Sequence, residues 1–269
     1  MLTFVPTPIG NLQDITFRAI EAFKKAELFL CEDTRVAKQL LRLLNEKITT
    51  IEINARFLSF NEHNGKERLS QIGSELKSLN AIYVSDAGTP SISDPGLLLV
   101  EFCQENGINY DVLPGATAVT TVYSASGFGN KFTFWGFLPH KNPKRDEELR
   151  EILSNQTDTI IYESPHRLLK LLQEITQKDP TREIFLAKEL TKKHQRYFRG
   201  SVKSLYEKLK DANIKGEWAL VIKRGNKKEQ NLPLEEILHM DIPPKIKAKI
   251  LSKMTKVPTK EWYKRLIDS

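Results

Sequence analysis

The chain has 269 residues, of which 40% are hydrophobic, and a formal net charge of +7. A chain of this length can bury a sizeable core and is typical of two domains. No apolar run approaches the roughly 18 residues of a membrane span, and residues 2–5 already resemble a strand. We therefore expect neither a transmembrane helix nor a signal peptide, and we predict a cytoplasmic protein.

Strand-like and helical segments alternate over the first 126 residues. The strand-like runs lie at 2–5, 28–31, 57–60, 81–84 and 110–113. Helical segments follow them at 16–26, around 40–44, and at 66–79, 97–105 and 116–126. This alternation predicts a mostly parallel sheet covered by helices on both faces. The loops that contain Pro8, Glu32, Asp86 and Pro114 then gather at the carboxyl ends of the strands, where doubly wound sheets bind their ligands.

Residues 84–96, VSDAGTPSISDPG, form the most informative of these loops. Gly88 permits a positive φ or a close backbone approach, and Asp94 before Pro95 is typical of a helix N-cap. The loop is longer than the usual 2–6 residues of such a connection, which favours contact with a ligand. A capped turn without a ligand is the alternative.

The pattern changes after Gly127, where strands outnumber helices. Strand-like runs lie at 132–137, 159–162, 183–188, 195–199 and 217–224, and helical segments at 146–153 and 202–209. Residues 140–145 are expected to form a basic loop, and Ser164 to cap a helix that has Pro165 at its first position. The neighbouring strands predict a mixed sheet in a second α/β domain.

A break in composition at 225–233, GNKKEQNLP, separates a short helical segment from this domain. We therefore predict an N-terminal α/β domain at 1–116, a second α/β domain at 117–225 and a basic helical segment at 226–269. Residues 223–269 hold 12 Lys and Arg against 6 Asp and Glu, a net charge of +6. Such an asymmetry is typical of a protein that binds RNA or DNA, whereas a lysine-rich surface that only serves solubility is the alternative.

Several common sites are absent from the sequence. Neither the P-loop motif G-x-x-x-x-G-K-[ST] nor the dinucleotide motif G-x-G-x-x-G occurs. Cys31 and Cys103 lie far apart without a Cys/His cluster, and the five histidines show no metal-ligand spacing. We expect two buried free thiols and no metal site. The basic run at 188–196 predicts a surface that positions phosphates or, alternatively, a solvated loop.

Nine short motifs follow one another in order and at coherent spacing. They are TPIGNLQDITFRA from Thr7, CEDTR from Cys31, EHN from Glu62, VSDAGTPSISDPG from Val84, LPG from Leu113, SASGF from Ser124, GFLP from Gly136, YESPHRL from Tyr162 and KELTK from Lys188. Together they resemble the ribosomal RNA small-subunit methyltransferase family. Members of that family methylate the ribose 2′-hydroxyl of a decoding-centre cytidine in 16S rRNA and have a tetrapyrrole-methylase-like fold. Ala116 and His140 depart from the residues usual there, which are proline and arginine.

The resemblance implies S-adenosylmethionine as the cofactor and a homodimer as the assembly. It places twelve residues at the cofactor: Pro8, Gly10, Asp86, Gly88, Thr89, Pro90, Pro114, Gly115, Thr117, Ala118, Tyr162 and Ala219. It places ten at the RNA: Asp33, Arg35, His63, Lys141, Arg145, His166, Arg167, Lys188, Lys192 and Arg196.

A ribose hydroxyl is a poor nucleophile, so a carboxylate that accepts its proton would accelerate methyl transfer by about 10²–10⁴-fold. The candidates are Glu32, Glu163 and Glu189, and the sequence does not rank them. Each charged candidate could instead be a partner in a structural ion pair. Two other functions remain open, a small-molecule methylase of the tetrapyrrole type and an RNA-binding protein without catalysis.

Overall fold

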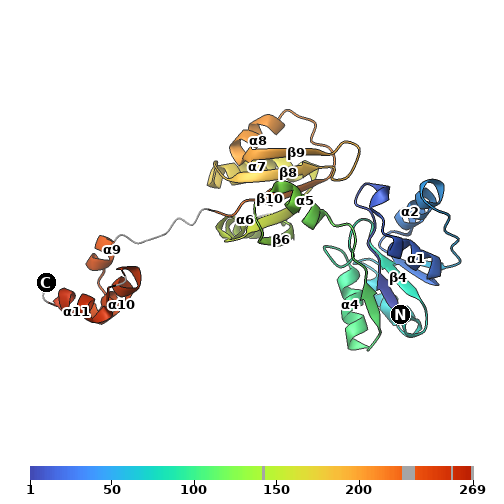
Figure 1. The fold of residues 1–269 in the computed structure, drawn as a ribbon, viewed down its shortest axis with the longest axis horizontal. Coiled ribbons are helices and arrows are strands. Elements are labelled where there is room, and N and C mark those ends of the chain that lie inside the picture. The colour runs from blue at the N-terminus through green and yellow to red at the C-terminus, as the bar shows by residue number, and fades with distance from the viewer. Residues whose placement is uncertain (141–142, 226–233, 256, 268–269) are drawn as a thin grey trace. The chain divides into compact units, whose positions relative to one another are not determined.

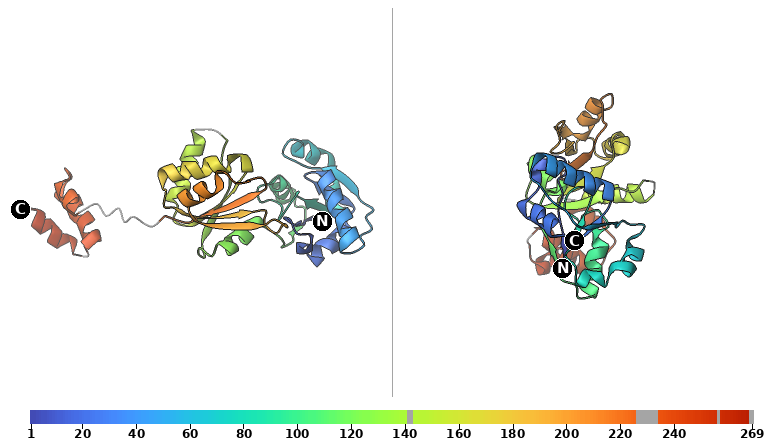
Figure 2. Two further views of the ribbon diagram at one scale, coloured as in Figure 1. Left: turned by 90° about the horizontal axis from the view of Figure 1, so that it is seen from above. Right: turned by 90° about the vertical axis from the view of Figure 1, so that its right-hand side faces the viewer.

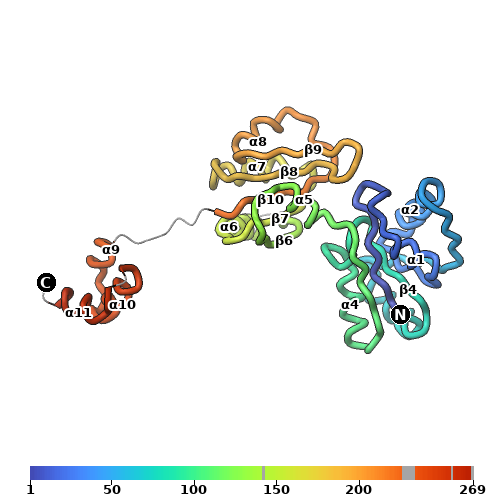
Figure 3. Tube along the Cα trace, viewed as in Figure 1, coloured from blue at the N-terminus to red at the C-terminus, as the bar shows by residue number. Residues whose placement is uncertain are grey.

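The computed structural model describes residues 1–140, 143–225, 234–255 and 257–267. The chain divides into two compact units, Met1–Arg224 and Gly225–Ser269. The larger unit contains two five-stranded sheets, and the chain passes from the first sheet to the second between β5 and α5 (Figures 1 and 3). In the described residues, no helix is long and apolar enough to cross a membrane.

The N-terminal sheet is entirely parallel and has the strand order β3-β2-β4-β1-β5. Its strands are β1 (Leu2–Phe4), β2 (Leu28–Cys31), β3 (Arg56–Ser59), β4 (Ala81–Val84) and β5 (Tyr110–Val112). Its helices are α1 (Phe17–Lys25), α2 (Thr34–Lys47), α3 (Gly65–Ile72) and α4 (Gly96–Glu105), with short 3-10 turns at Leu12–Asp14 and Glu75–Lys77. Every residue of β2 and β4 is buried, as expected for strands covered on both faces.

The helices lie on both faces of this sheet (Figure 1). On one face, Phe23 of α1 and Leu41 of α2 pack in one core cluster with residues of β2 and β4. On the other face, Leu69 of α3 and Leu99 of α4 pack around Tyr83. The helices after the neighbouring strands β1 and β4 thus cover opposite faces, which opens a crevice between the carboxyl ends of these two strands.

The second sheet is mixed and has the strand order β6-β7-β10-β8-β9. Its strands are β6 (Phe132–Phe137), β7 (Asp158–Glu163), β8 (Glu183–Lys188), β9 (Arg196–Ser201) and β10 (Trp218–Ile222). Its helices are α5 (Ala118–Ser126), α6 (Lys144–Ser154), α7 (Pro165–Lys178) and α8 (Val202–Leu209). Helices α6, α7 and α8 cover one face and α5 covers the other (Figure 2). Two α/β domains, one with a parallel and one with a mixed sheet, are therefore confirmed.

The smaller unit contains α9 (Leu234–His239), α10 (Pro244–Thr255) and α11 (Thr259–Ile267). Its core is small, with Ile237, Ala248 and Leu251 fully buried. The indole of Trp262 on α11 donates a hydrogen bond of 2.7 Å to Thr255 Oγ1, which ties α11 to the end of α10. The chain divides after Arg224, whereas the predicted basic helical segment begins at residue 226.

Several predicted boundaries were wrong. The helix expected at 66–79 ends at Ile72, and the next residue, Gly73, is a poor helix former. Gly73 packs against the ring of Phe102, where a Cβ would lie 2.5 Å from Cζ. The basic loop expected at 140–145 is shorter, since α6 begins at Lys144. The helix expected from 116 begins at Ala118, after Thr117 in extended conformation.

Two predicted caps differ in detail. Helix α4 begins at Gly96 with Pro95, not Asp94, at the N-cap position, although Asp94 Oδ1 accepts the Gly96 N–H at 2.8 Å. Ser164 occupies the N-cap position of α7, but its hydroxyl makes no capping hydrogen bond to the backbone. Instead, Ser164 Oγ accepts from Arg167 Nε at 3.4 Å. The side chain of Ser164 thus belongs to a polar network described below.

Candidate active site

A pocket of about 460 Å³ lies between the carboxyl ends of the parallel strands and a row of residues across the second sheet. This volume is typical of sites for small molecules and cofactors. The first sheet contributes the loops after β1, β2 and β4, and the second contributes the start of α5 and the ends of β6, β7, β8 and β10. The pocket is lined by Ile9, Glu32, Ser85, Asp86, Ala87, Gly88, Thr89, Ile92, Ser93, Asp94, Thr117, Ala118, Phe137, Tyr162, Glu163, Ser164, Pro165, Ala187, Leu190, Glu217, Trp218 and Ala219.

Backbone and side-chain hydrogen bonds join the loops around the pocket. Thr7 and Gly88 form an isolated antiparallel bridge, with N–H to O distances of 3.0 and 3.1 Å. Thr89 Oγ1 donates to the carbonyl of Ala116 at 3.0 Å, which links the loops after β4 and β5. Gly88 has a φ of +87°, a conformation that other L residues adopt only with strain. The predicted gathering of these loops is therefore found in the structure.

The polar part of the pocket wall is acidic. Five carboxylates line the pocket, from Glu32, Asp86, Asp94, Glu163 and Glu217, and no Lys, Arg or His side chain is among its lining residues. Like charges and partial burial in one wall disfavour the ionised carboxylates. A ligand that carries positive charge would relieve this cost, whereas a phosphate would add to it.

This environment raises the pKa values of Glu32 and Asp86. Burial raises the pKa of Glu32, and the charges of Asp86, Asp94 and Glu62 raise it further, against a hydrogen bond from the Asp86 N–H at 3.2 Å. The pKa of Asp86 is also raised, first by burial and then by the charge of Asp33. Glu32 Oε2 accepts the Asp86 N–H, and Oε1 has no hydrogen-bond donor in the described part of the chain.

The opposite wall is apolar and is built from one row of residues across the second sheet. Strand pairing places Ala219 of β10 opposite Tyr162 of β7 and Ala187 of β8. These three positions therefore face the same side of the sheet, toward α5 and the pocket. Burial raises the pKa of Tyr162 to about 12, so its phenol is neutral at physiological pH. The small alanines leave room for a flat group against the sheet.

Seven residues predicted to bind the cofactor line this pocket, namely Asp86, Gly88, Thr89, Thr117, Ala118, Tyr162 and Ala219. The other five are not among its lining residues: Pro8, Gly10, Pro90, Pro114 and Gly115. At two of these positions, Gly10 and Gly115, neighbouring atoms lie too close for a side chain. A Cβ on Gly115 would lie 2.8 Å from Pro6 Cγ, and one on Gly10 would lie 2.8 Å from the carbonyl oxygen of Leu190.

The three candidate bases have different surroundings. Glu32 and Glu163 line the pocket, but Glu189 does not. Glu189 Oε1 accepts the Glu217 N–H at 2.8 Å and lies 3.2 Å from Lys192 Nζ. Although burial opposes the change, these contacts lower the pKa of Glu189. Contacts with Lys192 and Glu217 thus hold Glu189 away from the pocket. Glu32, in contrast, faces the pocket and has a raised pKa.

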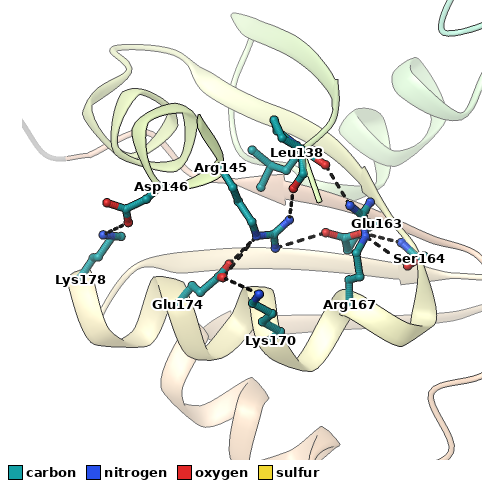
Figure 4. A network of polar contacts seen from close by, with 10 residues as sticks. Leu138, Arg145, Asp146, Glu163, Ser164, Arg167, Lys170, Glu174 and Lys178 are labelled. Carbon is teal, nitrogen blue, oxygen red and sulfur yellow. Dashed lines mark hydrogen bonds and ion pairs between the residues drawn. The ribbon is translucent and has the colours of Figure 1, made fainter. Parts of the chain in front are cut away.

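Glu163 belongs to a buried network of charged groups (Figure 4). Its Oε1 lies 2.6 Å from Arg167 Nη2 and accepts the Ser164 N–H at 2.8 Å, and its Oε2 lies 3.5 Å from Arg145 Nη2. Arg145 also donates through Nε to Glu174 at 2.9 Å. The Arg145 side chain is 1% exposed, so the structure contradicts its predicted role as an RNA contact. A guanidinium enclosed in this way cannot reach a phosphate.

Arg167 belongs to the same network through Glu163, and the other residues predicted to contact RNA differ in their exposure and their partners. The side chains of Arg35, His63, His166 and Arg196 are exposed, although Arg35 pairs with Asp33 at 2.5 Å. Lys188 donates to the carbonyl of Asn213 at 2.6 Å, and Lys192 pairs with Glu189 and Glu217, so these lysines have internal partners. Lys141 lies outside the described residues.

Ser85, Ile92 and Asp94 line the pocket and belong to the loop at 84–96 that was expected to contact a ligand, whereas sequence reasoning missed Phe137, Ala187, Leu190, Glu217 and Trp218. The hydroxyl of Ser85 is buried and has no hydrogen-bond partner, which marks it as a possible contact for a ligand. Strand alternation from Tyr162 and Ala219 could have indicated Ala187, because all three share one face. No cluster of His, Cys, Asp and Glu that could hold a metal occurs in the described ranges.

Comparison with known proteins places the chain in a family. The family model described as Tetrapyrrole (Corrin/Porphyrin) Methylases matches residues 1–206. A Helicobacter pylori protein named ribosomal RNA small subunit methyltransferase I is 44% identical over 283 residues, covering 100% of this chain and 99% of that protein. The protein of the same name from Thermotoga maritima is 42% identical, and the match covers 82% of this chain and 97% of the relative.

Solved structures show the same fold at low identity. Diphthine synthase matches with a TM-score of 0.64 at 13% identity, over 83% of this chain and 89% of that chain. Uroporphyrin-III C-methyl transferase of Thermus thermophilus, complexed with S-adenyl homocysteine, matches with a TM-score of 0.56 at 15% identity, over 82% and 96%. The fold is therefore that of the tetrapyrrole methylases. The chain belongs to that family and, within it, to the group named ribosomal RNA small subunit methyltransferase I, as its motifs had indicated.

Proposed function

We propose that the protein uses S-adenosylmethionine to methylate the ribose 2′-hydroxyl of a cytidine in 16S ribosomal RNA. The observation that carries this proposal is a pocket of cofactor size whose lining includes five carboxylates and no basic side chain. Relatives named as methyltransferases of small-subunit ribosomal RNA cover the whole chain and support the choice of substrate.

The residues of the pocket fit this cofactor. S-adenosylmethionine carries a positively charged sulfur, an ammonium group and one carboxylate, and its net positive charge matches the acidic wall. Asp86 and Asp94 would hold the positive end, the unpartnered Ser85 hydroxyl would meet a polar group, and Ala187 and Ala219 would hold the flat adenine. When bound, the cofactor supplies a methyl group activated by the charge on its sulfur.

Glu32 is the residue that we propose to accept the proton of the ribose hydroxyl. It lines the pocket, its Oε1 is free of hydrogen-bond donors in the described residues, and its pKa is raised toward the operating pH. The Asp86 N–H holds Oε2 and fixes the orientation of the carboxylate. Glu163 instead acts as a positioning residue, because both of its oxygens face guanidinium groups.

We further propose that the basic face of α10 and α11 contacts ribosomal RNA. These helices carry seven Lys and Arg residues against Glu261 as their acidic residue. Lys245, Lys249 and Lys253 are exposed on one side of α10 and have no ion-pair partner in the described part of the chain. Phosphates of a nucleic acid would supply the missing counter-charges.

The assembly and location are proposed on the resemblance of the chain to its family. We propose a homodimer in the cytoplasm. Tyr110 and Val112 on the edge strand β5 are exposed apolar residues, as expected where a second chain could cover them. Sedimentation equilibrium would give twice the chain mass of 30.9 kDa for a dimer and the chain mass itself for a monomer.

Transfer of a labelled methyl group tests the function directly. The protein is incubated with methyl-labelled S-adenosylmethionine and small ribosomal subunits that lack the modification, and the RNA is then digested to nucleosides. The expected product is labelled 2′-O-methylcytidine. Label on a base, or the absence of label from RNA together with transfer to a tetrapyrrole, would contradict the proposal.

A further inference from the structure

Phe137 is an exposed aromatic residue at the mouth of the pocket. It ends β6, lines the pocket and has 54% of its surface exposed, although large aromatic side chains are usually buried. Its ring centroid lies 5.5 Å from that of Tyr162, with the two planes at 63°. The residues of the inner wall, Ala187, Leu190 and Ala219, are at most 7% exposed. Phe137 therefore belongs to the entrance of the pocket and not to its interior.

An irregularity in β6 directs this ring. The pairing of β6 with β7 shifts register between Phe134 and Gly136, which inserts Trp135 as an extra residue. Gly136 is buried and has a φ of +78°, which glycine adopts without strain. Bulges of this kind occur next to active sites and re-aim the side chains that follow them. The bulge at Trp135 and the positive φ of Gly136 therefore set the direction in which the Phe137 side chain points.

The buried charged network holds the backbone immediately after Phe137. The carbonyl of Leu138 accepts from Arg167 Nη1 at 3.0 Å, and the carbonyl of Pro139 accepts from Arg145 Nη1 at 3.1 Å (Figure 4). Both guanidinium groups also face the carboxylate of Glu163. Burial of these charges carries a desolvation penalty, so stability alone does not account for the network. Its geometric effect is to fix the carbonyl groups of Leu138 and Pro139, one and two residues beyond Phe137.

We infer that Phe137 is the platform on which the base of the target nucleotide stacks, and that Arg145, Glu163 and Arg167 are the positioning residues that hold it. The inference rests on the proposed function and names the contact that captures the substrate. A ribose inside a folded RNA becomes accessible when its nucleotide leaves the base stack, and aromatic side chains then replace the lost stacking partner. Phe137 offers an uncharged planar surface at the entrance of an acidic pocket, which suits a neutral base better than a phosphate.

Three variants of one strand test the platform. Phe137→Ala removes the ring, Phe137→Trp keeps an aromatic surface, and Phe132→Ala removes a ring that is 39% exposed at the other end of β6 and lies outside the pocket lining. We expect Phe137→Ala to raise KM for small ribosomal subunits about tenfold, in line with the loss of one base-stacking contact. Binding of S-adenosylmethionine, followed by calorimetric titration, should stay within about twofold. Phe137→Trp should retain activity, and its added indole fluorescence should be quenched by RNA.

The positioning role is tested with Arg145→Lys, which keeps the charge beside Glu174 but cannot hold Glu163 and the Pro139 carbonyl together. It should raise KM for subunits with little change in cofactor binding. Because both substitutions disable the same contact, Phe137→Ala combined with Arg145→Lys should be no worse than the more damaging single variant. Multiplicative effects of the two substitutions would show that the network acts independently of Phe137 and would overturn this part of the inference.

The outcomes separate the inference from the function on which it rests. If wild-type protein methylates RNA and Phe137→Ala has an unchanged KM, the platform is refuted while the function stands. If Phe137→Ala weakens cofactor binding as much as RNA use, Phe137 belongs to the cofactor wall, and the inference is also refuted. If wild-type protein transfers no methyl group to RNA, the proposed function itself fails.

Discussion

The backbone N–H of Asp86 donates to Glu32 Oε2 at 3.2 Å, which joins the loops after the neighbouring strands β4 and β2 at the carboxyl ends of the parallel sheet. In return, Asp86 Oδ1 accepts the N–H of Asp33 at 3.1 Å. The two loops therefore hold their carboxylates against each other by reciprocal hydrogen bonds. Burial and the charges of neighbouring carboxylates raise the pKa values of Glu32 and Asp86 although these hydrogen bonds lower them, and the Asp86 N–H fixes the direction in which Glu32 faces.

Substitution of Glu32 is expected to affect turnover more than binding. Glu32→Gln keeps an oxygen for the Asp86 N–H but cannot accept a proton, so kcat should fall by about 10²–10⁴-fold. KM for S-adenosylmethionine and for subunits should change by less. Glu105→Gln is the matched control, because Glu105 is exposed and outside the pocket lining. Equal losses of kcat in the two variants, or an unchanged kcat in Glu32→Gln, would show that Glu32 does not accept the proton.

Glu32→Gln is also expected to change the way in which the stability of the folded protein depends on pH. The raised pKa of Glu32 means that the folded chain binds its proton more tightly than the unfolded chain does. Its contribution to stability is therefore fully present below the unfolded pKa of about 4.3 and declines as the pH rises through that value toward the folded pKa. Glu32→Gln should raise Tm at pH 7 and have a smaller effect near pH 4. Scanning calorimetry would contradict this if the variant were equally destabilised at both pH values.

Gly88→Ala is expected to damage both the fold and the site. A methyl group at a φ of +87° costs about 1–2 kcal/mol, and the new Cβ would lie 3.3 Å from Ile9 Cγ2 at the pocket wall. Gly107→Ala is the control, since Gly107 also has a positive φ, +62°, but its Cβ would have no neighbour within 4 Å. Chemical denaturation should show a similar loss in both variants. Calorimetry should show weaker binding of S-adenosylmethionine for Gly88→Ala alone.

The lysines of α10 are expected to contribute salt-dependent affinity for RNA. Neutralisation of Lys245, Lys249 and Lys253 by glutamine should weaken subunit binding and reduce the slope of log K against log salt by about 2–3, one unit or slightly less per phosphate contact. The control is the same change at Lys25, Lys47 and Lys77, which are exposed on the N-terminal domain. An identical salt slope in the two triple variants would assign the lysines of α10 to solubility.

Both thiols are expected to be unreactive in the folded protein. Cys31 and Cys103 are buried and unpaired, as predicted, and burial raises their pKa values to about 12 and about 11. At pH 8 almost no thiolate forms, so a thiol reagent should label the native chain slowly and label both cysteines after unfolding. Rapid labelling of the native protein would show that β2, which carries Cys31, or α4, which carries Cys103, opens easily.

The sequence was most informative where local chemistry decides the structure. The alternating apolar runs located the strands, and the composition of the loop around Asp86 and Gly88 indicated a ligand site at the sheet edge. What could not be predicted depends on partners distant in the chain. The sequence alone suggests that Arg145 is an exposed basic residue. In the fold, its guanidinium is buried between Glu163 of β7 and Glu174 of α7. Likewise, only the fold distinguishes these two candidate bases, because it places Glu32 in the pocket and Glu189 beside Lys192.

The central claim is that the crevice between Glu32 and the row of Tyr162, Ala187 and Ala219 is where the methyl donor binds. A crystal structure of the protein with S-adenosylmethionine tests this most directly. The account predicts the donor in this pocket, with its sulfur on the acidic side and its adenine against the alanines. A donor bound outside the pocket, or one with its sulfur remote from Glu32, would contradict it.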